Sequence, residues 1–119
     1  MTTTAFTLAN LSDLAGGAAQ TAAITPFTQT LLSNTILVTV AGAASIILAP
    51  SLWTIGNTCT IADIANFATR ASSPITITVI GGLLIEGRSS LLITEVGGTF
   101  ELCYVNASWT AFKIVGHGP

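Results

Sequence analysis

Four short segments in which apolar and polar residues alternate occupy residues 75–114, and turn sequences separate them. In the clearest segment, Ile75–Val79, isoleucine and valine alternate with threonine. Alternation with a period of two places apolar side chains on one face of a strand, and regularly spaced turns between short strands are typical of an all-β domain. The pattern predicts an all-β fold, a compact antiparallel sandwich or a barrel-like module. The turn sequences are Gly81-Gly82, residues 87–90, Gly97-Gly98 and residues 106–108.

Residues 31–50 contain no charged residue and are long enough to raise the possibility of a membrane-spanning helix. Between residues 35 and 40 two sets of residues alternate, which is a period of two and not the helical period of 3.6. The first set is Ile36, Val38 and Val40, and the second is Thr35, Leu37 and Thr39. β-Branched residues dominate the stretch, and neither flank carries the lysine or arginine that would orient a span. Two strands, at about 35–40 and 45–49, are therefore predicted, with the membrane span as the alternative.

The first 30 residues have weak periodicity and are rich in alanine, threonine and glycine. They predict an N-terminal arm, extended or partly helical, that is ordered mainly by what it contacts. The chain is accordingly divided into an arm (1–30), a β-domain (31–115) and a tail (116–119). The further strands expected in the β-domain are 58–64, 75–79, 83–86, 91–96, 99–105 and 109–115.

Only 7% of the 119 residues are charged, and the formal net charge is −2. A typical globular chain has about 25% charged residues, so threonine, serine, asparagine, glycine and alanine must cover this surface. Because protein interfaces are depleted of charge, the composition predicts that part of the surface is buried against other subunits, with the chain itself as one partner. The candidate interface residues are the large apolar side chains of the arm and both tryptophans: Phe6, Leu8, Leu11, Phe27, Trp53 and Trp109.

Few residues offer charge or metal-binding chemistry. Three basic residues cannot neutralise enough phosphates to bind nucleic acid at physiological salt. Cys59 and Cys103 with the single His117 cannot complete a four-ligand zinc site. Free buried thiols are predicted for the two cysteines, although a disulfide between them is not excluded by the sequence. No metal and no cofactor are expected.

The carboxylates that could act as catalytic acids or bases, Asp63, Glu86, Glu95 and Glu101, occur singly and without a companion motif. Glycoside hydrolysis would require two of them on either side of one bond, so we interpret each as a turn cap or a solvated strand position. His117 lies in a glycine-rich tail, and the paired glycines are interpreted as hairpin turns. No catalytic residue is predicted. Trp53, Tyr104 and Trp109 are expected to pack in a core or an interface, with a sugar-binding platform as the alternative.

The order of motifs after residue 60 resembles a recurrent β-rich module of bacteriophage virion proteins, namely head-decoration (cement) proteins, tail fibres and spikes. In that module a strand ends in aspartate and a turn, a proline-led strand follows, and an Ile-x-Gly corner precedes a hairpin that finishes with tryptophan. The resemblance covers roughly residues 35–115; Asn66 stands where glycine is usual in the first turn, and Ala62 where lysine is frequent. The matching stretches are Ile61–Ala68, Pro74–Ile77, Ile85–Gly87, Ser89-Ser90, Gly97–Leu102 and Asn106–Trp109.

The resemblance implies a homotrimer located in the virion, on the surface of the phage head, after assembly in the host cytoplasm. The leading expectation is a non-enzymatic capsid decoration protein that binds the major capsid lattice and stabilises the head. The alternative is a short tail fibre or spike module that recognises a host surface glycan. Neither expectation includes a nucleic-acid or membrane partner.

Overall fold

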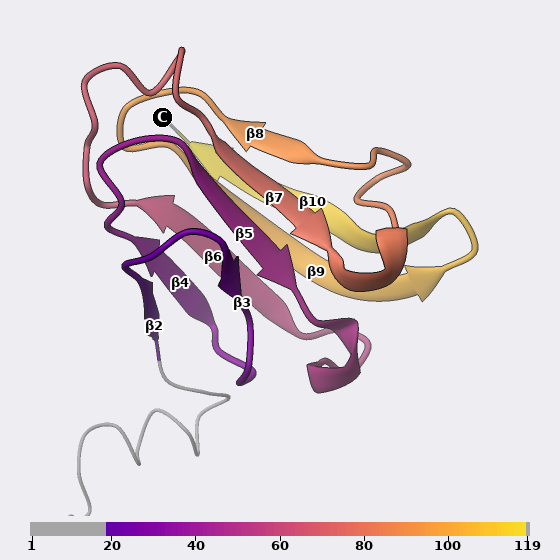
Figure 1. The fold of residues 1–119 in the computed structure, drawn as a ribbon. Helices are drawn as coiled ribbons and strands as arrows, with labels where there is room; N and C mark the ends of the chain where they lie inside the picture. Colours follow the sequence, from indigo (N-terminus) through magenta and orange to yellow (C-terminus); the bar gives the residue numbers. More distant parts are fainter. Residues whose placement is uncertain (1–18, 119) are drawn as a thin grey trace, which may run out of the picture.

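The alternating segments form strands in two sheets that face each other (Figure 1). The computed structural model describes residues 19–118, and within them the expected all-β class is confirmed. The five-stranded sheet has the order β10-β9-β6-β4-β2, and the four-stranded sheet the order β3-β5-β7-β8. Two short 3-10 helices, η1 (Pro50–Leu52) and η2 (Ile80–Gly82), follow β5 and β7. The strands are β2 (Gln20–Ala22), β3 (Phe27–Thr28), β4 (Thr35–Val38), β5 (Ala44–Leu48), β6 (Thr58–Asp63), β7 (Ile75–Val79), β8 (Leu91–Ile93), β9 (Thr99–Ala107) and β10 (Thr110–Gly118).

The first six of these strands alternate between the two sheets. β4 pairs in parallel with β2 and β6, and β5 pairs in parallel with β3 and β7. Parallel neighbours require a crossover connection, and here each crossover contains a strand of the opposite sheet. The expectation of an antiparallel sandwich is therefore wrong for this part of the chain, because both sheets are mixed.

The last three strands add antiparallel pairs. β8 pairs with β7, β9 pairs with β6, and β9 and β10 form a hairpin. Gly97-Gly98, expected to be a hairpin turn, instead carries the chain from β8 in one sheet to β9 in the other. Gly81-Gly82 lies in η2, and the expected strand 83–86 is reduced to isolated bridges of Ile85.

The core lies between the two sheets. The alternation predicted for β4 and β7 is confirmed, since Ile36, Val38, Ile75 and Ile77 are fully buried. Trp53 packs edge-to-face on Phe112, with ring centroids 4.7 Å apart. Its indole N–H donates to Gln29 Oε1 at 2.8 Å, which also accepts the Ala49 N–H at 3.0 Å. These contacts give one continuous aromatic and aliphatic core.

The domain boundaries differ from those expected. The range 20–28, assigned to the arm, contributes β2 and β3 to the two sheets, and residues 116–118 of the expected tail belong to β10. The helix considered near the N-terminus lies outside the described residues. Residues 31–50 form β4 and β5, and no helix among residues 19–118 has the length and apolarity needed to cross a bilayer.

Cys59 and Cys103 are both free thiols, as predicted, but only Cys59 is buried. The register explains why they do not pair: Cys103 lies opposite Thr58, so the next residue, Cys59, points to the other face of the sheet. Burial raises the pKa of Cys59 to about 12, although a hydrogen bond with the backbone of Ile36 lowers it.

We therefore expect one thiol per chain to react with a thiol-disulfide reagent in the native protein at mildly alkaline pH. Cys103 supplies this thiol, because a thiolate is the reactive form and Cys59 is both buried and protonated. Both thiols should react after unfolding in urea. Equal reaction rates of the two cysteines in the native protein would contradict the assigned register.

Candidate interaction surface

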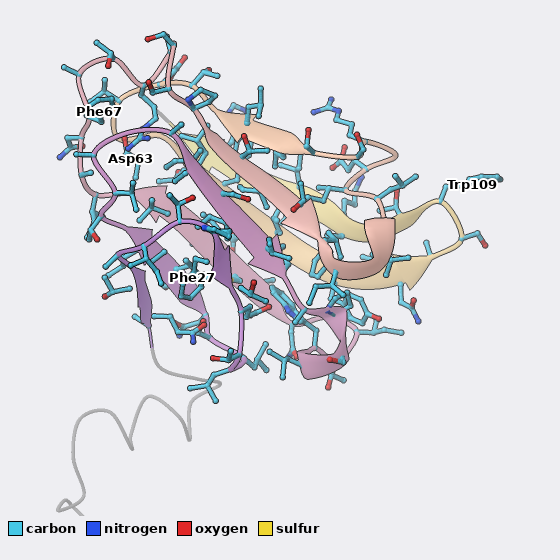
Figure 2. The ribbon with its side chains drawn as sticks, in the orientation of Figure 1. Phe27, Asp63, Phe67 and Trp109 are labelled. Atoms are coloured by element: carbon cyan, nitrogen blue, oxygen red, sulfur yellow. The ribbon has the colours of Figure 1, made fainter. Side chains whose placement is uncertain are left out.

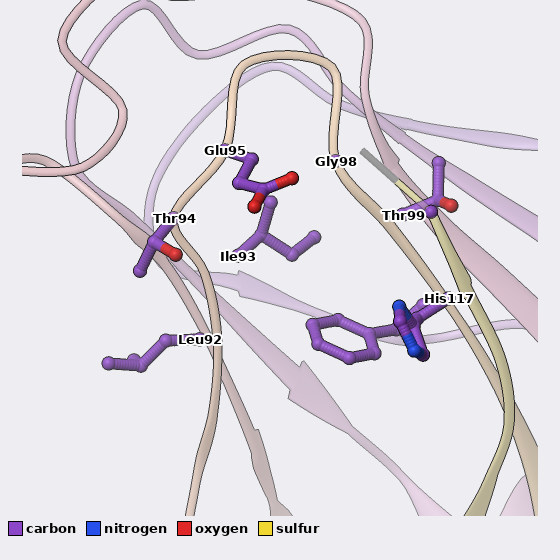
Figure 3. Close-up of a pocket in the computed structure, with 9 residues that line it drawn as sticks. Leu92, Ile93, Thr94, Glu95, Gly98, Thr99 and His117 are labelled. Carbon is purple, nitrogen blue, oxygen red and sulfur yellow. The ribbon is translucent and has the colours of Figure 1, made fainter.

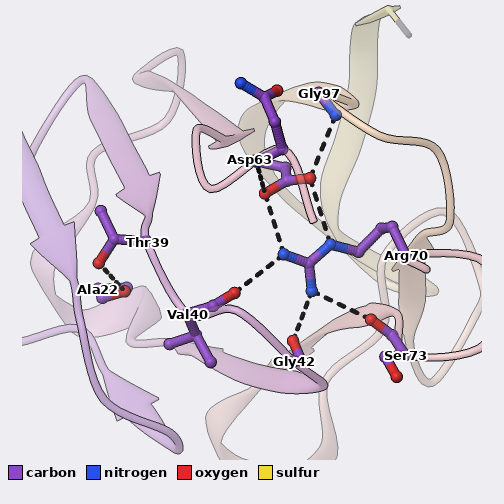
Figure 4. Close-up of polar contacts among 9 residues, drawn as sticks. Ala22, Thr39, Val40, Gly42, Asp63, Arg70, Ser73 and Gly97 are labelled. Carbon is purple, nitrogen blue, oxygen red and sulfur yellow. Dashed lines mark hydrogen bonds and ion pairs between the residues drawn. The ribbon is translucent and has the colours of Figure 1, made fainter. Parts of the chain in front are cut away.

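A buried ion pair fixes one end of the two sheets (Figure 4). The Arg70 guanidinium donates to both carboxylate oxygens of Asp63, at 3.2 Å from Nε and 3.0 Å from Nη2. Its remaining donors bind the carbonyls of Val40, Gly42 and Ser73. Both side chains of the ion pair are completely buried, and all five guanidinium N–H groups have an acceptor.

The Asp63 carboxylate also accepts the backbone N–H of Asn66 at 3.2 Å and of Gly97 at 3.1 Å. Three connections between the sheets, 39–43, 64–74 and 94–98, thereby meet at one ion pair. The local backbone suits this role, because Asn66 and Gly97 both have positive φ and a Cβ on Gly97 would lie 3.0 Å from Asn66 Oδ1. Asp63, considered as a possible catalytic carboxylate, is a structural residue here.

The pKa of Asp63 lies below its ordinary value of 3.8: burial raises it, but the hydrogen bond and charge of Arg70 and the two backbone N–H groups outweigh burial. The unfolded chain therefore binds this proton more tightly, and stability rises with pH between the folded and unfolded pKa values. The contribution of Asp63 is complete above about pH 4 and is lost as the pH falls through the folded pKa. We expect the free energy of unfolding in urea to decline with acid in this window, and to decline less in Asp63→Asn. An equal decline in both proteins would contradict the assignment.

The opposite end of the domain gathers exposed apolar side chains in four loops (Figures 1 and 2). Trp109, in the β9–β10 turn, is 80% exposed and points away from the domain. We call this surface the loop end. It consists of Leu31, Ile55, Ile80, Leu83 and Trp109, which are half of the large hydrophobic side chains that the described residues expose.

Hydrogen bonds join these loops to one another. Gln29 Oε1 connects the loop before β4 to Ala49 and Trp53 beside η1. The N–H of Gly56 donates to the Tyr104 carbonyl near the end of β9, and the N–H of Ala111 donates to the Leu84 carbonyl. The apolar side chains of the loop end are thus carried on loops that are attached to the core.

The segments that carry these side chains, residues 29–34, 49–57, 80–84 and 106–110, contain no charged residue, and the β7–β8 connection reaches its two charged residues, Glu86 and Arg88, only after them. Exposed apolar side chains grouped without charge are a common mark of a protein–protein contact. A large aromatic side chain such as Trp109 is the residue type that contributes most to binding when a partner buries it. The loop end is therefore the candidate interaction surface.

The candidate interface residues are distributed unevenly. Phe27 is half-buried in β3 and packs on the core, and Trp53, 6% exposed, belongs to the core and not to the surface. Trp109 is the exposed candidate, whereas Phe6, Leu8 and Leu11 lie outside the described residues. The tryptophans and Tyr104 do not form a surface platform, because Trp53 and Tyr104 pack around Phe112.

Of the remaining carboxylates, Glu86 accepts the Ile114 N–H at 2.7 Å and lies 3.8 Å from the Lys113 ammonium. Glu95 and His117 line a cleft at the end that holds Asp63. Within residues 19–118, no three side chains of histidine, cysteine, aspartate or glutamate come together to hold a metal ion. The sequence did not single out Leu31, Ile55, Ile80 and Leu83, although Ile55 and Ile80 lie directly beside glycine turns.

Comparison of the sequence with models of known protein families and with curated proteins finds no match.

Proposed function

We propose that the protein is a non-enzymatic structural component of a phage virion, a capsid decoration protein that assembles as a homotrimer and reinforces the head. The observation that carries the proposal is the loop end, in which five exposed apolar side chains lie in loop segments without charge at one end of the domain. Contact between three copies through this surface would remove Trp109 and its neighbours from water. Burial of apolar surface contributes about 25 cal/mol per Å², from which the entropy cost of association must be subtracted.

The resemblance of residues 35–115 to virion modules supports the choice of partner, the major capsid lattice. We assign one contact with that lattice to the N-terminal residues, including Phe6, Leu8 and Leu11, which lie outside the described residues. The loop end would then hold the three copies together while their N-terminal segments contact the shell. A short fibre or spike that binds a host glycan is the alternative.

The proposal is tested by adding purified protein to phage heads that lack decoration protein. Saturable co-sedimentation with the heads, at a copy number divisible by three, is the expected result, together with a higher temperature of head disruption. Binding to tails alone, or to host glycans without binding to heads, would instead support the fibre.

A further inference from the structure

A cleft of about 330 Å³ opens between the two sheets at the end opposite the loop end (Figure 3). One wall comes from β8 and the residues after it, with Leu92, Ile93 and Glu95. The other wall comes from the paired ends of β9 and β10, with Phe100 and His117. We call it the His117 cleft.

A β-bulge turns His117 into this cleft. Ile114 lies opposite Leu102, and regular pairing would then place Gly116 opposite Phe100. The register shifts between Ile114 and Gly116, so His117 takes the position opposite Phe100, and the two rings lie 6.2 Å apart. Because directly paired residues project from the same face, the imidazole joins the inner face. Bulges commonly redirect a side chain in this way beside functional sites.

The inner wall of the cleft is apolar and closely packed. Ile93 is 2% exposed, and Phe100 packs on the core. A Cβ on Gly98 would lie 2.7 Å from Ile93 Cγ2 and 3.0 Å from the Glu95 carbonyl oxygen, so the backbone reaches close to the wall only because this residue is glycine. An aliphatic chain or a flat group can lie along such a surface without displacing side chains.

Glu95 is the one charged side chain among the residues that line the cleft, which contains no lysine or arginine. Among residues 19–118 its carboxylate forms no ion pair. The cleft therefore combines an apolar slot, two aromatic rings and an unpaired negative charge. This combination disfavours anions and suits a ligand with an apolar stem and a cationic head, because such a head can bind the carboxylate and pack against a ring.

We infer that the His117 cleft binds an arginine or lysine side chain of the protein to which this chain attaches. Arginine fits best, since its planar guanidinium can pair with a carboxylate and stack on an aromatic ring at once. The aliphatic stem would lie along Ile93 and Phe100, with the head at Glu95. The identity of that partner rests on the proposed function, whereas the chemistry of the cleft does not.

The test is a titration of the 119-residue chain with Nα-acetyl-arginine amide, followed by NMR of the His117 ring. A saturable shift is expected, and the neutral isostere Nα-acetyl-citrulline amide should produce none at the same concentrations. Glu95→Gln should weaken binding by about tenfold. Glu101→Gln removes the same charge from the outer face of the sheet, where Glu101 lies opposite Gly116, and should leave binding unchanged.

Absence of a saturable shift would overturn the inference, as would equal binding of the citrulline analogue or equal weakening by both glutamine variants. Saturable binding of a neutral methyl glucoside in place of the arginine probe would also overturn it and would favour a sugar site. Thermal unfolding of both variants checks that the fold is retained. Failure of the proposed assembly would appear in the oligomeric mass and in co-sedimentation with heads, neither of which this titration measures.

Discussion

Replacing Asp63 with alanine is expected to lower the free energy of unfolding by about 3–5 kcal/mol, because it leaves the Arg70 guanidinium buried without its counter-ion. The variant also removes the acceptor of two backbone N–H groups, those of Asn66 and Gly97. Three connections between the sheets lose their common contact. Urea denaturation of the wild-type protein and of Asp63→Ala at neutral pH measures the difference.

Lys113→Ala is the matched control, since it breaks the other ion pair of the described residues, in which the Lys113 side chain is 62% exposed. Exposed pairs contribute about 0–1 kcal/mol, so this variant should unfold almost as the wild type does. Equal losses in Asp63→Ala and Lys113→Ala would mean that the buried pair does not join the sheets as described.

Replacing Trp109 with serine is expected to weaken association of the subunits by at least about thirtyfold, which corresponds to the roughly 2 kcal/mol typical of a buried tryptophan in an interface. The side chain is 80% exposed in the single chain, so its loss should leave the fold and the thermal stability of the monomer unchanged. Sedimentation velocity over a dilution series gives the association constant of each protein.

Val115→Ser is the control for this experiment, because it removes another half-exposed apolar side chain, on β10, away from the loop end. It should associate like the wild type. If Val115→Ser weakened association and Trp109→Ser did not, the contact would lie on the sheet and the loop end would not be the interface.

The strands themselves could be predicted from sequence, but their partners could not. Ile36 and Val38 point inward whether the neighbouring strand runs parallel or antiparallel, because a period of two specifies a face and not a direction. The turn sequences were interpreted as hairpins because a turn sequence, like a period of two, does not show which strand the next strand pairs with. Gly97 illustrates the error: its N–H binds the Asp63 carboxylate in a crossing between the sheets, and its positive φ and the nearby Asn66 Oδ1 explain why glycine is needed there.

The candidate site was predictable only in part. An aromatic residue in an apolar segment suits a core or an interface equally, and the partners that make Trp53 a core residue are distant in sequence: Gln29, which accepts its indole N–H, is 24 residues away, and Phe112 packs on its ring. The sequence indicates the position of Trp109 more clearly than that of Trp53, because Trp109 directly follows the turn sequence that begins at Asn106. Ile55 and Ile80 carried a usable signal, because an apolar residue beside a glycine turn is placed where the chain reaches the surface. No local sequence pattern predicted the ion pair of Asp63 with Arg70, and the only indication was the small number of charged residues in the chain.

The oligomeric mass of the purified 119-residue chain is the sharpest test of trimer formation through the loop end, whose exposed apolar side chains are proposed to contact other copies. Sedimentation equilibrium at micromolar concentration should give three times the mass of one 12.1 kDa chain, and Trp109→Ser should shift the equilibrium toward the single chain. A protein that stays monomeric and soluble at high concentration, with Trp109 still exposed, would rule out association through the loop end.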